Sequence, residues 1–261
     1  MKRFLRLCAE LCFPPRCVGC GERLAPTVGK DKPTYFCDRC TPKWQKALVS
    51  QSPDCSKALC ECDCQPSLMK KAGSAGLLKL APYDTENTGD PMVYAIRSIK
   101  KHPRARAVDC FARELAPVLE KRMHEEGEKM PVSHTVMAYI PRARWKIRRF
   151  GFDHAEALAR RLSQLSGVPF LPLLTRLRDG REQKKLTQKE RQENLKDAFG
   201  LKVPPKGLCV ILVDDVVTTG ADMAEATRLL RRSGAAQVLC VSVALTPKKK
   251  GTSKRDPQQN T

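Results

Sequence analysis

Residues 210–222 read VILVDDVVTTGAD, and this stretch predicts the fold of the chain. Residues 210–213 form a short apolar run rich in β-branched side chains, which is typical of a strand buried on both faces of a parallel sheet. Asp214 and Asp215 follow at the carboxyl end of that strand, the edge at which open α/β sheets bind their ligands. Apolar residues recur at helical spacing over 223–232. The segment therefore predicts a strand, a turn and a helix of an α/β fold.

The turn between this strand and this helix carries chemistry suited to a sugar phosphate. Thr218, Thr219 and Gly220 lead through Ala221 and Asp222 into the helix, where backbone N–H groups converge and favour a phosphate. The two preceding acids suit vicinal hydroxyls and a metal ion, so we expect a receptor for a ribose phosphate. The alternative is an ordinary strand–loop–helix unit with two polar loop residues. Asp222 has its own alternative, an acid facing the positive end of the helix dipole.

The rest of the chain alternates strands with helices. We expect strands over 77–83, 134–140 and 237–245, and helices over 91–101, 106–123 and 153–165. This alternation predicts a parallel sheet. Residues 65–76 are rich in Pro, Gly and Ser and are interpreted as a linker. We therefore expect a Cys-rich domain over 1–70, an α/β domain over 77–247, and a basic, disordered tail over 248–261.

Ten of the thirteen cysteines lie before residue 65. Two C-x2-C pairs, Cys17 with Cys20 and Cys37 with Cys40, have the spacing of a structural zinc site with four thiolate ligands. A redox dithiol is the competing interpretation. Such a tetrathiolate site leaves no position open for substrate, so its zinc would be structural.

A second cysteine cluster follows with irregular spacing. It consists of Cys55, Cys60, Cys62 and Cys64. Either these four form a degenerate second zinc site, or one of them is a spectator, because ligand geometry and not cysteine count decides a metal site.

The chain is strongly basic, with 48 Lys and Arg residues, 28 acids, a net charge of +20 and a pI near 9.6. This balance favours polyanionic partners. Residues 142–149 are predicted to form a basic loop at a strand end, suited to pyrophosphate or a nucleic-acid backbone. Residues 175–199 are long, polar and typical of a binding loop or lid. No apolar run is long enough to span a bilayer and no signal peptide is evident, so we expect a cytoplasmic protein.

Several motifs together resemble the ComF family. They are the cysteine knuckles after Phe13-Pro14-Pro15, the Gly151-Phe152-Asp153-His154-Ala155 turn, the Gln183-Lys184…Arg191…Asn194…Phe199 segment, and VILVDDVVTTG, which resembles the phosphoribosyl-pyrophosphate loop of type I phosphoribosyltransferases. The resemblance covers residues 12–245 and implies a zinc ribbon joined to a type I phosphoribosyltransferase-like domain.

The resemblance also implies roles for individual residues. Asp214 and Asp215 would act at the ribose with Mg2+, and the turn 218–222 would hold the 5-phosphate. Arg142 and Arg144 would lie on the pyrophosphate loop, and Lys100 matches a family lysine. The lid would carry Arg176, Arg178, Gln183, Lys184, Arg191 and Asn194. The chain departs from the family pattern at Phe150, where Arg is usual, at Lys101-His102-Pro103, and at Asp222, where Thr or Ser is usual.

Two classes of function follow. The leading hypothesis is a Mg2+-dependent phosphoribosyltransferase that uses phosphoribosyl pyrophosphate and is linked to DNA uptake. The alternative is a non-catalytic competence factor or adaptor that binds single-stranded DNA or other competence proteins, such as a helicase or translocase. The acceptor substrate is not specified by the sequence.

Overall fold

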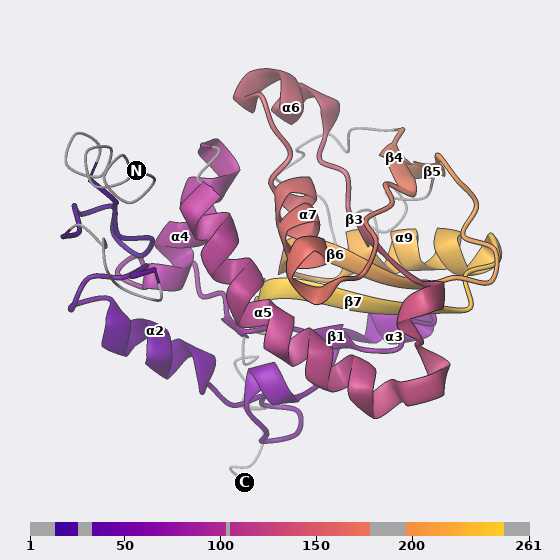
Figure 1. The fold of residues 1–261 in the computed structure, drawn as a ribbon, viewed down its shortest axis with the longest axis horizontal. Coiled ribbons are helices and arrows are strands. Elements are labelled where there is room, and N and C mark those ends of the chain that lie inside the picture. Colours follow the sequence, from indigo (N-terminus) through magenta and orange to yellow (C-terminus); the bar gives the residue numbers. More distant parts are fainter. Residues whose placement is uncertain (1–13, 26–32, 103–104, 178–196, 248–261) are drawn as a thin grey trace, which may run out of the picture.

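A parallel sheet of five strands forms the centre of the computed structural model, which describes residues 14–25, 33–102, 105–177 and 197–247 (Figure 1). The strands β3 (Thr135–Tyr139), β6 (Cys209–Val217) and β7 (Gln237–Leu245) are neighbours in that order. The short strands β1 (Leu77–Leu78) and β2 (Ala81–Pro82) both pair with β7, and every pairing in this sheet is parallel. The predicted parallel α/β fold is confirmed.

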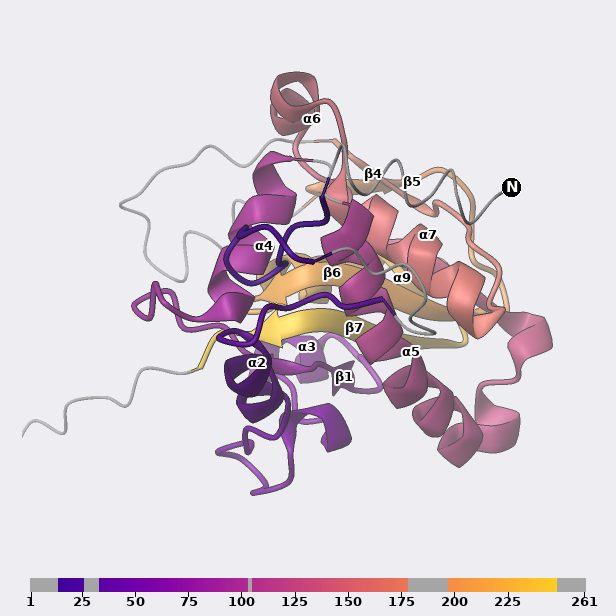
Figure 2. The ribbon, with the colours of Figure 1, turned by 60° about the vertical axis from the view of Figure 1, so that its left-hand side comes forward.

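Both faces of the sheet are covered, because successive side chains of its strands point to opposite sides. Ile211 and Val213 pack into one core together with α4 (Pro91–Lys101), α5 (Ala105–Glu126) and α7 (His154–Ser166). Val210 and Leu212 pack into the other core with α3 (Ser67–Lys71) and α9 (Ala221–Arg232). Figures 1 and 2 show these helices as two layers on either side of the strands.

The remaining elements are short. They are α2 (Thr41–Leu48), α6 (Arg144–Phe150), the 3-10 turns η1 (Leu59–Glu61), η2 (Gly127–Lys129) and η3 (Val132–His134), and the strands β4 (Leu174–Arg176) and β5 (Phe199–Leu201), which form a separate antiparallel pair. In the part of the chain that the structure describes, no helix combines the length and the apolar character needed to cross a membrane.

Two predicted strands differ from the observed ones. The strand expected over 210–213 continues to Val217, because β6 keeps its pairing with β7 from Asp214, opposite Ser242, as far as Leu245. The two acids therefore lie within the strand and not after it. The strand expected over 77–83 is divided into β1 and β2, and Lys79 between them is fully buried.

The linker predicted over 65–76 is wrong for residues 67–71. They form α3, which packs against α9 and buries the side chain of Met69 completely. Pro66 and the small residues that suggested a flexible segment instead begin and end this short helix. The segment packs against the turn that precedes α9.

The Cys-rich segment packs directly on the α/β part. The Trp44 ring is stacked between Phe36, at 4.5 Å between centroids, and Phe111 of α5, at 5.9 Å. Trp44 also donates a hydrogen bond from Nε1 to Glu114 Oε1 at 3.3 Å. Aromatic packing of this kind contributes beyond the buried area alone, about 0.5–1.5 kcal/mol per pair. The two parts of the chain therefore share one hydrophobic core.

Candidate functional site

The two adjacent acids of β6 have different surroundings. Asp215 is 4% exposed, and its Oδ2 lies 2.9 Å from Lys100 Nζ at the end of α4. Its Oδ1 lies 3.3 Å from Nε2 of His154, the first residue of α7. Asp214 is half-buried, faces the adjoining pocket and accepts a hydrogen bond from the Asp215 amide at 2.8 Å. Three elements therefore meet at the acid pair.

These surroundings shift the pKa values of the two carboxyls in opposite directions. Burial raises the pKa of Asp214 well above its usual range, and the neighbouring charge of Asp215 raises it further. Burial alone would also raise the pKa of Asp215, but the charge of Lys100, followed by that of His154, outweighs burial and lowers it. Loss of the proton from Asp214 is therefore disfavoured while Asp215 is ionised, which limits the repulsion between two buried like charges.

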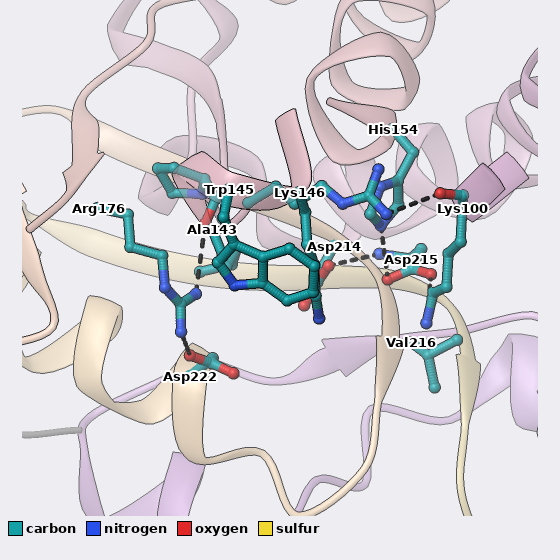
Figure 3. A pocket seen from close by; sticks show the side chains of 13 residues that line it. Lys100, Ala143, Trp145, Lys146, His154, Arg176, Asp214, Asp215, Val216 and Asp222 are labelled. Carbon is teal, nitrogen blue, oxygen red and sulfur yellow. Dashed lines mark hydrogen bonds and ion pairs between the residues drawn. The ribbon is translucent and has the colours of Figure 1, made fainter. Parts of the chain in front are cut away.

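A pocket of about 260 Å³ opens beside Asp214 and Asp215 (Figure 3). Six residues predicted for the site from the sequence line it: Lys100, Arg142, Arg176, Asp214, Asp215 and Asp222. Trp145, Lys146 and His154 line it as well. Cationic side chains outnumber ionised acids around the pocket, which suits an anionic ligand.

Arg176 reaches this pocket from β4. Its Nη2 lies 3.1 Å from Asp222 Oδ1 on the first turn of α9, and its Nη1 donates to the Pro141 carbonyl at 3.3 Å. Its guanidinium lies 5.1 Å from the centroid of the Phe199 ring. Arg176, which we expect on a lid, lies in the strand β4, opposite Phe199 of β5. The other expected lid residues, Arg178, Gln183, Lys184, Arg191 and Asn194, lie outside the described residues.

Of the predicted phosphate turn 218–222, Asp222 lines this pocket, whereas residues 218–221 do not. Thr218 and Thr219 are exposed, Gly220 is buried with a φ of +77°, and α9 begins at Ala221. A Cβ atom on Gly220 would lie 2.9 Å from the Met69 side chain and 3.1 Å from Pro66. Glycine is therefore required here both by the backbone conformation and by the close approach of α3.

The basic segment after β3 is a helix and not the predicted loop. Residues 144–150 form α6, which ends where Gly151 adopts φ +78° and donates its amide to Ile147 O at 2.7 Å. With neither Pro nor Gly between 142 and 150, nothing in this stretch opposes a helical turn. Arg144 belongs to α6 but does not line the pocket.

Arg142 lies at the base of this segment and holds it in place. Its Nη2 donates to Lys100 O at 2.7 Å, and its amide donates to Asp153 Oδ2 at 2.8 Å. The guanidinium also lies 4.7 Å from the centroid of Phe150, the residue that replaces the Arg usual in the family. Arg142 thus connects the pocket wall to both α4 and α7.

The first cysteine cluster could hold a metal ion. The sulfur atoms of Cys17, Cys20, Cys37 and Cys40 all lie within 4.8 Å of one another, and the Cys20 and Cys37 sulfurs are 3.7 Å apart. Four converging thiols match a tetrahedral thiolate site.

The second cluster brings together three of its four cysteines. The sulfurs of Cys55, Cys62 and Cys64 lie within 4.8 Å of one another, whereas the Cys60 thiol points to the Leu48 carbonyl at 3.4 Å. Cys60 is therefore the cysteine that does not join the cluster, which is one of the two alternatives that the irregular spacing left open. Lys79 adds a cation, because its buried Nζ lies 3.0 Å from Cys62 Sγ and donates to the carbonyls of Cys62, Cys64 and Leu77.

Comparison with known proteins supports the resemblance to one family. Residues 147–260 match the model of the phosphoribosyl transferase domain. The DNA utilization protein YhgH of Salmonella typhimurium is 32% identical over 154 residues, which cover 58% of this chain and 66% of that protein. Competence protein F of Haemophilus influenzae is 34% identical over 103 residues, covering 38% of this chain and 45% of that protein. The matched domain and these relatives support assignment of the chain to the ComF family. Its match spans just under two thirds of the length of the YhgH relatives.

Solved structures similar to this chain include a hypoxanthine phosphoribosyltransferase of Staphylococcus aureus. It is 14% identical with a TM-score of 0.33, covering 54% of this chain and 64% of that one. An adenine phosphoribosyltransferase of Leishmania tarentolae is 15% identical with a TM-score of 0.31, covering 57% and 74% respectively.

The sequence patterns did not indicate the roles of three residues. His154 stood out only as part of the turn 151–155, whereas in the structure its ring contacts Asp215. Trp145 stands among the basic residues of 142–149, and its aromatic character there was the available signal. Lys79 stands within an apolar stretch, which indicates either that its side chain is exposed or that it has a buried partner. Only the packing of the cysteine segment distinguishes these two alternatives.

Proposed function

We propose that the pocket beside Asp214 and Asp215 binds phosphoribosyl pyrophosphate together with Mg2+, in a phosphoribosyltransferase-like protein linked to DNA uptake. The observation that carries the proposal is the meeting of this acid pair with the cations Lys100 and Arg176 at one pocket. The acid pair and Arg176 lie inside the segment 147–260 that matches a phosphoribosyl transferase domain. The names of the relatives, DNA utilization protein and competence protein, support the link to DNA. We place this function in the cytoplasm, where free thiols persist.

Each part of the pocket would have its own role. Asp214 and Asp215 would accept hydrogen bonds from the ribose hydroxyls, and the amides at the start of α9 would face the 5-phosphate. Lys146 and Arg142 would stabilise the pyrophosphate. Arg176 is held by Asp222 at 3.1 Å, so a phosphate arriving there would compete with that carboxylate for the guanidinium.

The acid pair fits Mg2+ through Asp214 better than through Asp215. Both Asp215 oxygens already have cationic or imidazole neighbours, whereas Asp214 faces the pocket. Held by Asp214, Mg2+ would neutralise part of the charge of the pyrophosphate. Because the pKa of Asp214 is raised, binding of the cation would favour loss of its proton.

The reaction would be displacement at the ribose C1 carbon. The bond from C1 to the pyrophosphate oxygen breaks, and its electron pair leaves with the pyrophosphate. A lone pair of the acceptor forms the new bond to C1, and the acceptor's proton passes to solvent. Cationic side chains around the pocket would stabilise the departing pyrophosphate, the charge that grows as this bond breaks.

Pyrophosphate release tests whether the chain turns over. The wild type is incubated with phosphoribosyl pyrophosphate, Mg2+ and a panel of nucleobases and amines, beside Asp215→Asn and a control, Glu120→Gln, at an exposed carboxylate of α5. Release by the wild type and the control, but not by Asp215→Asn, supports the transferase. Release that Asp215→Asn leaves unchanged rules out this pocket as its source.

The second candidate function is nucleic-acid binding without turnover, favoured by the net charge of +20. Phosphate contacts made by Lys and Arg release counterions, so the affinity for single-stranded DNA would fall steeply with salt. Fluorescence anisotropy of a labelled oligonucleotide over a salt series measures this slope. This function would be favoured over the transferase if the affinity for the oligonucleotide falls steeply with salt, if Asp214→Asn/Asp215→Asn leaves that affinity unchanged, and if no pyrophosphate is released.

As a further proposal, we infer that the first cysteine cluster holds one structural zinc ion. Its four thiolates would close the tetrahedron and leave no position for substrate. The ion would stabilise the segment that packs against α5 through Trp44 and Phe36.

A further inference from the structure

We propose that the indole ring of Trp145 is the stacking surface for a planar nucleobase that enters the pocket beside Asp214. This inference rests on the proposed function and deepens it, because it names the chemical class of the second ligand. The base can come from a free nucleobase or from a single-stranded nucleic acid, and the same ring serves both.

The exposure of Trp145 is the first observation. Among the large exposed hydrophobic residues in the described part of the chain, Trp145 is the one with an aromatic ring, and it is 37% exposed. The other tryptophan, Trp44, is 3% exposed and stacked between two phenylalanines. An indole left in water at the wall of a pocket is an unused apolar surface, and such surfaces mark sites of ligand contact.

The direction of the ring is the second observation. Figure 3 shows the indole of Trp145 in front of Asp214, with Arg176 to one side, and Trp145 lines the same pocket as the acid pair. A base stacked on this ring would lie beside the position that we assign to the ribose. It would therefore stand where an acceptor must stand to reach the C1 carbon.

The charge around the ring is the third observation. Lys146 Nζ lies 5.2 Å from the Trp145 ring centroid, and α6 carries four basic residues and no acid over 144–150. Stacking on an aromatic ring next to cations that meet the phosphates is how proteins hold bases of single-stranded nucleic acid without reading their sequence. The same pairing suits a nucleobase beside pyrophosphate.

Ile147 provides a matched control on the same helix. It is 36% exposed, almost the same as Trp145, but it does not line the pocket. If α6 bound ligands merely as an apolar surface, Ile147→Ala and Trp145→Ala would weaken binding alike. If the ring is a stacking surface at the pocket, only the tryptophan matters.

Tryptophan fluorescence tests the proposal, since the chain has two tryptophans and Trp44→Phe leaves Trp145 as the sole reporter. This variant is titrated with adenine, guanine and uracil, with an oligothymidylate, and with an abasic oligonucleotide of the same length, each with and without Mg2+ and phosphoribosyl pyrophosphate. We expect saturable quenching by free bases or by the base-bearing oligonucleotide, and none by the abasic one. The arm that quenches identifies the source of the base.

Equilibrium dialysis of the quenching ligand then compares the variants. We expect Trp145→Ala to weaken binding by about 5- to 150-fold, Trp145→Phe to retain most of it, and Ile147→Ala to leave it unchanged. Equal binding by Trp145→Ala and wild type, or equal quenching by the abasic oligonucleotide, would overturn the inference. Calorimetric titration of the wild type with phosphoribosyl pyrophosphate and Mg2+ is run alongside. If the wild type binds phosphoribosyl pyrophosphate but no base quenches Trp145, the stacking surface alone is contradicted. If the wild type does not bind phosphoribosyl pyrophosphate, the proposed function is contradicted.

Discussion

Replacing Asp214 with Asn should stabilise the ligand-free protein, although Asp214 belongs to the proposed site. Asn keeps the oxygen that accepts the Asp215 amide at 2.8 Å and removes the second acid beside Asp215. The folded pKa of Asp214 is raised, so between its unfolded value near 3.8 and that folded value only the unfolded chain loses the proton. Over this range the wild type loses stability as the pH rises, and Asp214→Asn does not.

The size of the effect follows from the same linkage. One pKa unit corresponds to about 1.4 kcal/mol, and about 1 kcal/mol shifts the melting temperature of a domain of 150–250 residues by about 2–4 °C. We therefore expect Asp214→Asn to melt at least about 2 °C above the wild type at pH 8, and the gain to shrink at pH 5. Thermal denaturation followed by circular dichroism at both pH values measures this.

The neighbouring carboxyl supplies a control of opposite sign. Asp215→Asn removes the partner of Lys100, whose side chain is 37% exposed, so we expect a loss of about 2 kcal/mol, below the range for fully buried pairs. If Asp214→Asn melts below the wild type at pH 8, or if its gain is the same at pH 5, the raised pKa of Asp214 is contradicted.

Three further substitutions have expected outcomes. Lys79→Met should lower the free energy of unfolding by about 3 kcal/mol or more in denaturant titration, because its buried ammonium satisfies three carbonyls; a loss below about 1 kcal/mol would contradict this. Cys37→Ser should abolish bound metal in elemental analysis of the purified protein, whereas Cys60→Ser should retain it, and equal metal content in both would refute the ligand assignment. Asp222→Ser should tighten binding of phosphoribosyl pyrophosphate by about tenfold in calorimetry by freeing Arg176, whereas weaker binding would show that the carboxylate helps to hold the ligand.

The local pattern of the sequence predicted the acid pair, the glycine turn and the cysteine knuckles, because each depends on residues close together along the chain. It also predicted the parallel sheet, since alternating apolar strands and helices have few other ways to bury their faces. Even so, β6 extends through the acids, because hydrogen bonding to β7 continues where the apolar run stops.

Contacts between distant segments were beyond the reach of such patterns. Nothing near Asp215 indicates that Lys100 and His154 will surround it, and nothing near Arg176 indicates a pair with Asp222. These pairs arise from the packing of α4, α7 and β4 around one edge of the sheet. Segment 65–76 was misassigned because burial against α9 outweighs its loop-like composition. Segment 142–149 was misassigned because its place after a strand suggested a loop, whereas its residues form a helix that ends at Gly151.

Calorimetric titration of phosphoribosyl pyrophosphate in the presence of Mg2+ tests the central claim most directly, namely that the pocket beside Asp214 and Asp215 is its binding site. The wild type, Asp214→Asn/Asp215→Asn and the exposed control Glu120→Gln are compared at one salt concentration, after thermal denaturation has shown that each is folded. We predict saturable binding of one ligand per chain by the wild type and the control, and its loss in the double variant. Absence of binding by the wild type, or equal binding by the folded double variant, would contradict the claim.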